Sequence, residues 1–144
     1  MNDMQITKHF TLRELTTTDI EELKEKNYEE GRLKLYELCK VAVLLEAVRL
    51  LLNSPMTITS GYRCGEVNNA IKGSKTSQHL RAEAADFIPL KLSAKEAFDM
   101  IRKSDIKYGQ LILEKRGNGH LIHISVGTKR QNLYSPAQGV YNAI

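Results

Sequence analysis

Residues 32–52 carry a regular apolar stripe, with an apolar residue at every third or fourth position. The stripe consists of Leu35, Leu38, Ala42, Leu45, Val48 and Leu52. This spacing places all of these side chains on one face of an α-helix, and such a face has to be buried against another apolar layer. Asn53-Ser54-Pro55 follows and ends the helix, because proline cannot continue it. The chain must therefore fold around one long amphipathic helix.

Short β-rich segments follow this helix. We expect strands at residues 56–60, 85–88, 109–114, 121–126 and 131–134, the last of them at a sheet edge. Gly117-Asn118-Gly119 separates two of these strands and is typical of a hairpin turn. Capping boxes at Thr11–Glu14 and Ser93–Glu96 indicate the starts of two further helices. This order predicts an α+β fold, with N-terminal helices packed on a central antiparallel β-sheet.

The length and charge of the chain limit its class. The 144 residues fit one domain, which we expect to span 1–144 with a core at 10–134. A net charge of +4 without a basic block or interleaved aromatic residues argues against nucleic-acid binding. No apolar run reaches the ~20 residues that a membrane-spanning helix needs. The start, MNDMQITKHF, lacks the features of a secretory signal, so we expect synthesis in the cytoplasm.

Two histidines and an aspartate are candidates for a metal site. Asp86 follows His79 by seven residues at the start of an expected strand, and His123 lies in the second arm of the expected hairpin. A catalytic zinc ion takes three protein ligands and keeps one position open for water. Two imidazoles and one carboxylate meet this requirement and leave the site with one net positive charge. By itself the spacing is a weak signal, because a single histidine more often has a hydrogen-bonded structural role.

The neighbouring residues resemble those of a known family. Four segments follow the pattern of the zinc D-alanyl-D-alanine carboxypeptidases: Ser60-Gly61-Tyr62-Arg63, Ser77-Gln78-His79, Ala84-Ala85-Asp86 and His123-Ile124-Ser125. This family has a hedgehog/DD-peptidase-like fold. It also includes vancomycin-resistance D,D-dipeptidases and the L-alanyl-D-glutamate endopeptidase domains of phage endolysins. Residues 10–15 and 110–114 are similar to its small phage-associated branch, so the resemblance runs from about Phe10 to Val126.

The resemblance implies a zinc peptidase that cleaves the stem peptides of bacterial peptidoglycan. The cut bond is either D-Ala-D-Ala, as in a carboxypeptidase, or an internal bond, as in an endolysin-type endopeptidase. The implied ligands of Zn²⁺ are His79, Asp86 and His123. We expect a monomer that acts at the cell wall, which it would reach through export by another component or through phage-mediated lysis.

The family pattern also assigns roles to residues around the metal. Arg63 matches the arginine that binds substrate, and its planar guanidinium suits a carboxylate or a developing oxyanion. Ser77 matches a serine that either hydrogen-bonds substrate or caps a turn. Tyr62 and Gln78 are interpreted as scaffold residues.

One position departs from the family pattern. Many relatives carry the catalytic glutamate three residues before the last zinc-binding histidine, where this chain has His120. Glu114 and His120 are therefore alternative general bases. If Glu114 pairs with Leu121, then Glu114 and His123 lie on one face of the hairpin, whereas a one-residue shift of register separates them. Imidazole titrates at about pH 6.5 and can act as a base, but strand alternation puts His120 and His123 on opposite faces.

The departure also leaves a non-catalytic alternative. A cell-wall-binding or phage structural module could keep the fold and the metal without turning over a substrate. Metal content, measured together with the turnover of a D-Ala-D-Ala peptide, separates the enzyme from this module.

Overall fold

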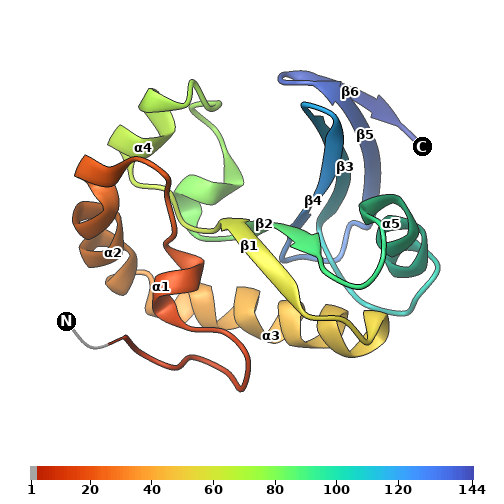
Figure 1. Cartoon of the computed structure of the whole chain (residues 1–144), viewed down its shortest axis with the longest axis horizontal. Coiled ribbons are helices and arrows are strands. Elements are labelled where there is room, and N and C mark those ends of the chain that lie inside the picture. The colour runs from red at the N-terminus through yellow and green to blue at the C-terminus, as the bar shows by residue number, and fades with distance from the viewer. Residues whose placement is uncertain (1–2) are drawn as a thin grey trace.

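The computed structural model describes residues 3–144 and confirms an α+β fold (Figure 1). The elements in chain order are α1 (Leu12–Leu15), η1 (Glu21–Leu23), α2 (Lys24–Arg32), α3 (Leu35–Leu52), β1 (Met56–Ser60), α4 (Gly65–Ala70), η2 (Gln78–Arg81), β2 (Ala84–Pro89), α5 (Ala94–Arg102), β3 (Gln110–Arg116), β4 (Gly119–Ser125), β5 (Gln131–Ala137) and β6 (Val140–Ala143). Both predicted capping boxes form, at Thr11 before α1 and at Ser93 before α5. Among the helices of residues 3–144, none is long and apolar enough to cross a membrane.

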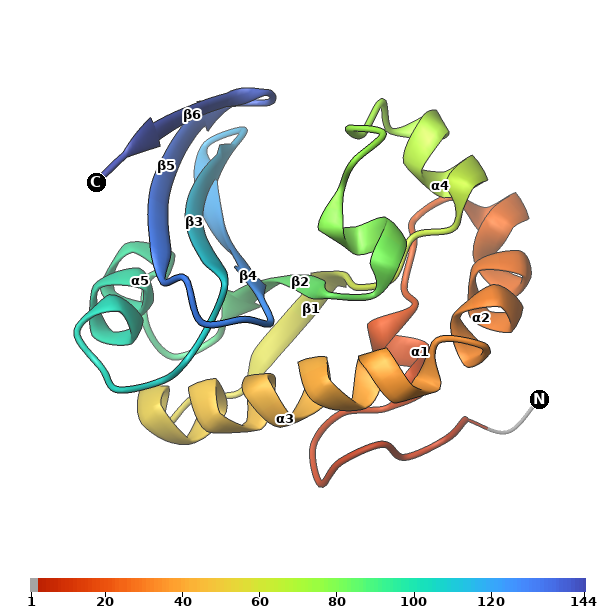
Figure 2. The ribbon, with the colours of Figure 1, turned by 180° about the vertical axis from the view of Figure 1, so that it is seen from behind.

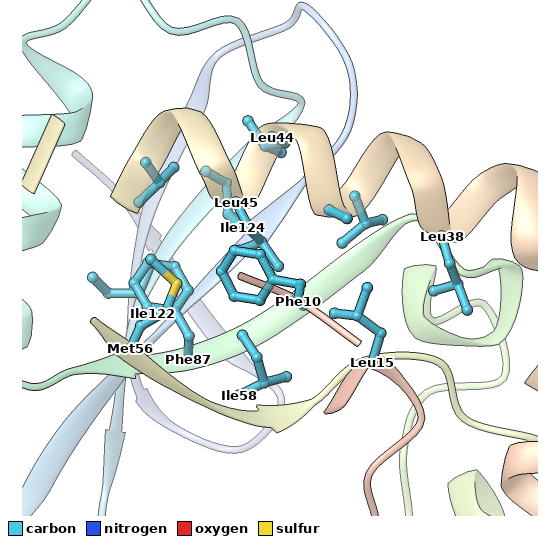
Figure 3. Close-up of a cluster of buried hydrophobic side chains, with 14 of the residues drawn as sticks. Phe10, Leu15, Leu38, Leu44, Leu45, Met56, Ile58, Phe87, Ile122 and Ile124 are labelled. Carbon is cyan, nitrogen blue, oxygen red and sulfur yellow. The ribbon is translucent and has the colours of Figure 1, made fainter. Parts of the chain in front are cut away.

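The long helix α3 buries its predicted stripe against the strands. All of its members except Leu35 are buried, and Asn53 ends the helix in the left-handed conformation with φ 49°. The helix begins at Leu35 rather than near Arg32, because residues 24–32 form the separate helix α2. Phe10, from the segment before α1, lies between α3 and the strands β1 and β2 (Figure 3). One apolar core thus joins the N-terminal helices to the sheet.

The six strands form one sheet in the order β1-β2-β4-β3-β5-β6. The expected antiparallel pairing holds for four of the pairs, but β3 and β5 are parallel, so the sheet is mixed. After β4, residues 126–130 pass the start of β3, where the Gln131 amide donates to the Gly109 carbonyl at 2.9 Å. Strand β5 therefore starts beside the start of β3 and runs in the same direction. Strand β6, which the sequence did not indicate, takes the edge position that we expected for residues 131–134.

Strand alternation gives the sheet two different faces. Ile122 and Ile124 of β4 belong to the core, whereas His123 between them lines a cleft on the other face. On β3, Leu113 likewise faces the core and Glu114 lines the cleft. The core thus fixes which side chains reach the cleft, because successive residues of a strand point to opposite faces.

Candidate metal centre and catalytic cleft

A cleft of about 1170 Å³ opens on the face of the sheet away from α3. One wall comes from the loop 71–77 and from η2, and the other from β3, β5 and β6. Figures 1 and 2 show these two groups of elements facing each other, with β2 between them. The cleft is lined by Arg63, Ser77, His79, Asp86, Glu114 and His123, which are six of the seven predicted site residues.

The three predicted metal ligands converge at the bottom of the cleft. The possible ligand atoms of His79, Asp86 and His123 all lie within 4.8 Å of one another. Asp86 Oδ1 is 3.1 Å from His79 Nε2 and 2.9 Å from His123 Nδ1. A tetrahedral zinc site with bonds of about 2.05 Å separates its donor atoms by about 3.3 Å. The cluster could therefore hold a zinc ion after a small rearrangement of these side chains.

Hydrogen bonds on the far side of each ring fix which nitrogen faces the cluster. His79 Nδ1 lies 2.7 Å from the Gly61 carbonyl oxygen, which can only accept, so Nδ1 carries the proton. His123 Nε2 lies 2.7 Å from Gln78 Oε1 and donates to it in the same way. The other nitrogen of each ring faces the Asp86 carboxylate. These short contacts need a proton or a cation between the two atoms, so the donor set fits a divalent metal, which can replace the protons.

Burial and charge shift the pKa values of His79 and Asp86 in this cluster. Burial lowers the pKa of His79 despite the nearby Asp86 carboxylate, which keeps the ring neutral, as a metal ligand must be. Burial alone would raise the pKa of Asp86. The interactions with His79 and His123 outweigh this effect and hold the Asp86 pKa far below its usual range. The site therefore offers the Asp86 carboxylate and a neutral imidazole from His79.

Arg63 lies beside the cluster of candidate metal ligands. Its Nε donates to Ser60 Oγ at 3.0 Å, and its Nη2 lies 3.5 Å from Asp86 Oδ2. Asn27 of α2, which is fully buried, fixes the backbone on both sides of Arg63. Its Nδ2 donates to the Tyr62 carbonyl at 3.0 Å, and its Oδ1 accepts from the Cys64 amide at 2.8 Å. Sequence reasoning missed Asn27, because a polar residue in a charged helix gives no sign of being buried.

The register of the β3–β4 hairpin separates the two candidate bases. Glu114 pairs with Leu121, and Ile112 pairs with His123, so Glu114 and His123 share the cleft face. His120 pairs with Lys115 and lies on the opposite face, where its ring is 6.3 Å from that of Tyr134. Glu114 therefore lies on the same face as the candidate metal ligands, whereas His120 lies on the opposite face.

The surroundings of Glu114 suit proton transfer. Its side chain is buried, and Arg116 Nη2 lies 3.1 Å from its Oε2. Burial raises the pKa of Glu114, and the charge of Asp86 raises it further. A carboxylate with a raised pKa accepts a proton more readily near neutral pH.

A model of the family described as peptidase M15 matches residues 8–125. This span contains Arg63, the three candidate metal ligands and Glu114. The chain belongs to the peptidase M15 family. The peptidases of this family are metalloenzymes, in agreement with the His-Asp-His cluster. A comparison with curated proteins finds no match.

In this M15 peptidase, η2 positions two of the candidate metal ligands, His79 and His123. Ser77 Oγ caps η2 by accepting from the His79 amide at 3.2 Å, which is the turn-capping role considered above. Contact between Ser77 and substrate stays a prediction. Gln78, interpreted from the sequence as scaffold, lines the cleft and holds His123. Its position between Ser77 and His79 was the only signal in the sequence for this role.

Replacing Gln78 by leucine is expected to weaken zinc binding about 10- to 100-fold without unfolding the protein, because His123 loses the partner that orients its ring. Gln78→Glu is the matched control, since a carboxylate still accepts from His123 Nε2. Competition with a fluorescent chelator measures the zinc affinity of both variants. A leucine variant that binds zinc as tightly as the parent protein would contradict this role.

Proposed function

We propose that this M15 peptidase is a zinc enzyme that hydrolyses a peptide bond in the stem peptides of peptidoglycan. The main support is the convergence of His79, Asp86 and His123 in a cleft, with Glu114 on the same face of the sheet. His79, Asp86 and His123 would hold the zinc ion, which when bound would lower the pKa of a water molecule and polarise the scissile carbonyl. The peptidoglycan substrate is inferred from the family.

The remaining side chains supply binding and proton transfer. Glu114 accepts a proton from the attacking water and delivers it to the leaving amine. Arg63 faces the cleft beside Asp86, where its guanidinium can bind a substrate carboxylate or the oxyanion that develops at the carbonyl. Arg116 holds one oxygen of Glu114, so the other oxygen remains for the water.

Glu114 supplies a carboxylate of the kind whose absence favoured the non-catalytic alternative. That alternative rested on the missing glutamate of the Glu-x-x-His pattern, the position that His120 occupies. Glu114, on the strand paired with that of His123, places a carboxylate on the cleft face. We also propose that the protein belongs to the phage-associated branch and acts in lysis. This part of the proposal is supported only by the sequence resemblance of residues 10–15 and 110–114.

Zinc content and peptide cleavage together test the proposed function. The purified protein is expected to bind one equivalent of zinc and to cleave a stem peptide ending in D-Ala-D-Ala, purified peptidoglycan, or both. Release of D-alanine identifies a carboxypeptidase, and new internal termini identify an endopeptidase. Removal of the metal with a chelator should abolish cleavage, and added zinc should restore it. Bound zinc without cleavage of either substrate would instead support the binding module.

A further inference from the structure

The β5–β6 hairpin lies beyond the family match, which ends at residue 125, yet it forms part of the cleft wall. From these strands and their turn, Leu133, Gln138 and Tyr141 line the cleft. We infer that this hairpin is a binding subsite for the peptide chain that extends from the cleaved bond, with Tyr141 as its main contact. This inference rests on the proposed function.

Strand register connects the hairpin directly to the metal centre. One cross-strand row of paired residues runs over five strands: Asp86, His123, Ile112, Leu133 and Ala143. Paired residues of neighbouring strands point to the same face. Strands β5 and β6 therefore extend the metal-bearing face of the sheet beyond Glu114.

Tyr141 is available for a ligand. It lies two residues before Ala143, on the same face of β6, and 53% of its surface is exposed. Tyr141 and Glu114 both line the cleft, and burial raises the pKa of the Tyr141 hydroxyl. A tyrosine offers both an apolar ring and a hydrogen-bonding hydroxyl.

The tip of the hairpin reaches the opposite wall. Gln138 Nε2 donates to the carbonyl of Lys72 at 3.1 Å and to that of Ile71 at 3.4 Å. Figure 2 shows this turn facing the loop that follows α4. Gln138 thus links the two walls of the cleft at the tip of the hairpin.

The polar side chains at this end of the cleft fit the backbone amide groups of a peptide chain. The hairpin supplies the amides of Gln131 and Gln138, and Gln110 of the neighbouring strand β3 donates to Gln131 at 2.8 Å. Amides both donate and accept, as peptide groups do. Three strand spacings of about 4.8 Å separate β4 from β6, about 14 Å in total, which about four extended residues span. A stem peptide reaches the hairpin, whereas a dipeptide does not.

The subsite is tested by measuring kcat/KM for a series of substrate peptides that increase in length from two to five residues. Tyr141→Ala is expected to lower kcat/KM about tenfold for the longest peptide and to leave the shortest unchanged, because only the long chain reaches the ring. Val140→Ala is the matched control, since Val140 is exposed on the other face of β6. It should match the parent protein at every length.

Binding of the same peptides to Glu114→Gln protein gives a readout that does not need turnover. In that background the affinity should rise with peptide length, and adding Tyr141→Ala should remove the rise. Equal losses at all lengths, or no loss at any length, would overturn the subsite. Length-dependent binding through Tyr141 without any cleavage by the parent protein would support the subsite and count against the proposed function.

Discussion

Replacing Glu114 by glutamine is expected to lower kcat by a factor of about 10²–10⁴, while the protein keeps its fold and its metal. Glutamine has nearly the same shape as glutamate but cannot accept the proton of the attacking water. Zinc affinity should be preserved, because the cluster that could hold the metal consists of His79, Asp86 and His123. Turnover of the cleaved stem peptide and zinc content, measured on the same preparation, check both parts of this expectation.

His120→Ala is the matched control for Glu114. The His120 ring lies on the face of the sheet away from the cleft, so its loss should leave kcat within about twofold of the parent value. Glu114→Ala should be as inactive as Glu114→Gln, since neither side chain can take up a proton at this position. An active Glu114 variant, or an inactive but folded His120→Ala protein, would reverse the assignment of the base.

The long helix and the convergence of the candidate ligands could be predicted from the sequence, since both depend on strong local patterns. The stripe on α3 fixes its buried face, and the family motifs mark His79, Asp86 and His123. The choice between Glu114 and His120 could not be made, because one residue of register in the hairpin changes the face of both side chains. The core settles the register: Ile122 and Ile124 must be buried, which leaves His123 on the cleft face.

The C-terminal strands were the weakest part of the sequence prediction. Strand β6 is exposed along its whole length and carries no alternation of apolar and polar residues, so Val140–Ala143 gave no strand signal. The parallel pairing of β3 and β5 depends on where residues 126–130 pass, and local propensity does not encode that path. Asn27 was missed, and the contact of the predicted scaffold residue Gln78 with His123 was not foreseen, because both roles arise only when distant segments meet.

Replacing Gly61 by alanine is expected to destabilise the metal-free protein by about 3 kcal/mol or more. A Cβ at this position would lie 2.2 Å from the carbonyl oxygen of Leu15 and 2.7 Å from its carbonyl carbon. These are backbone atoms at the end of α1, so they cannot rotate away as the tip of a side chain could. The same Leu15 oxygen accepts the Tyr62 amide at 2.8 Å, and this bond is lost if the two segments separate. Urea denaturation without metal measures the change directly.

Gly65→Ala is the control for Gly61, because a Cβ there meets no atom within 4 Å. Gly65 is the first residue of α4, where alanine favours the helix, so stability should stay constant or rise by up to about 1 kcal/mol. The two substitutions add the same methyl group only a few residues apart, which isolates the contact with α1 as the cause of any difference. Gly61 also supplies the carbonyl that orients His79, so Gly61→Ala should weaken zinc binding in the molecules that remain folded. A Gly61→Ala protein as stable as Gly65→Ala would show that α1 does not pack against this segment. The support for His79, the first candidate ligand, would then have to lie elsewhere.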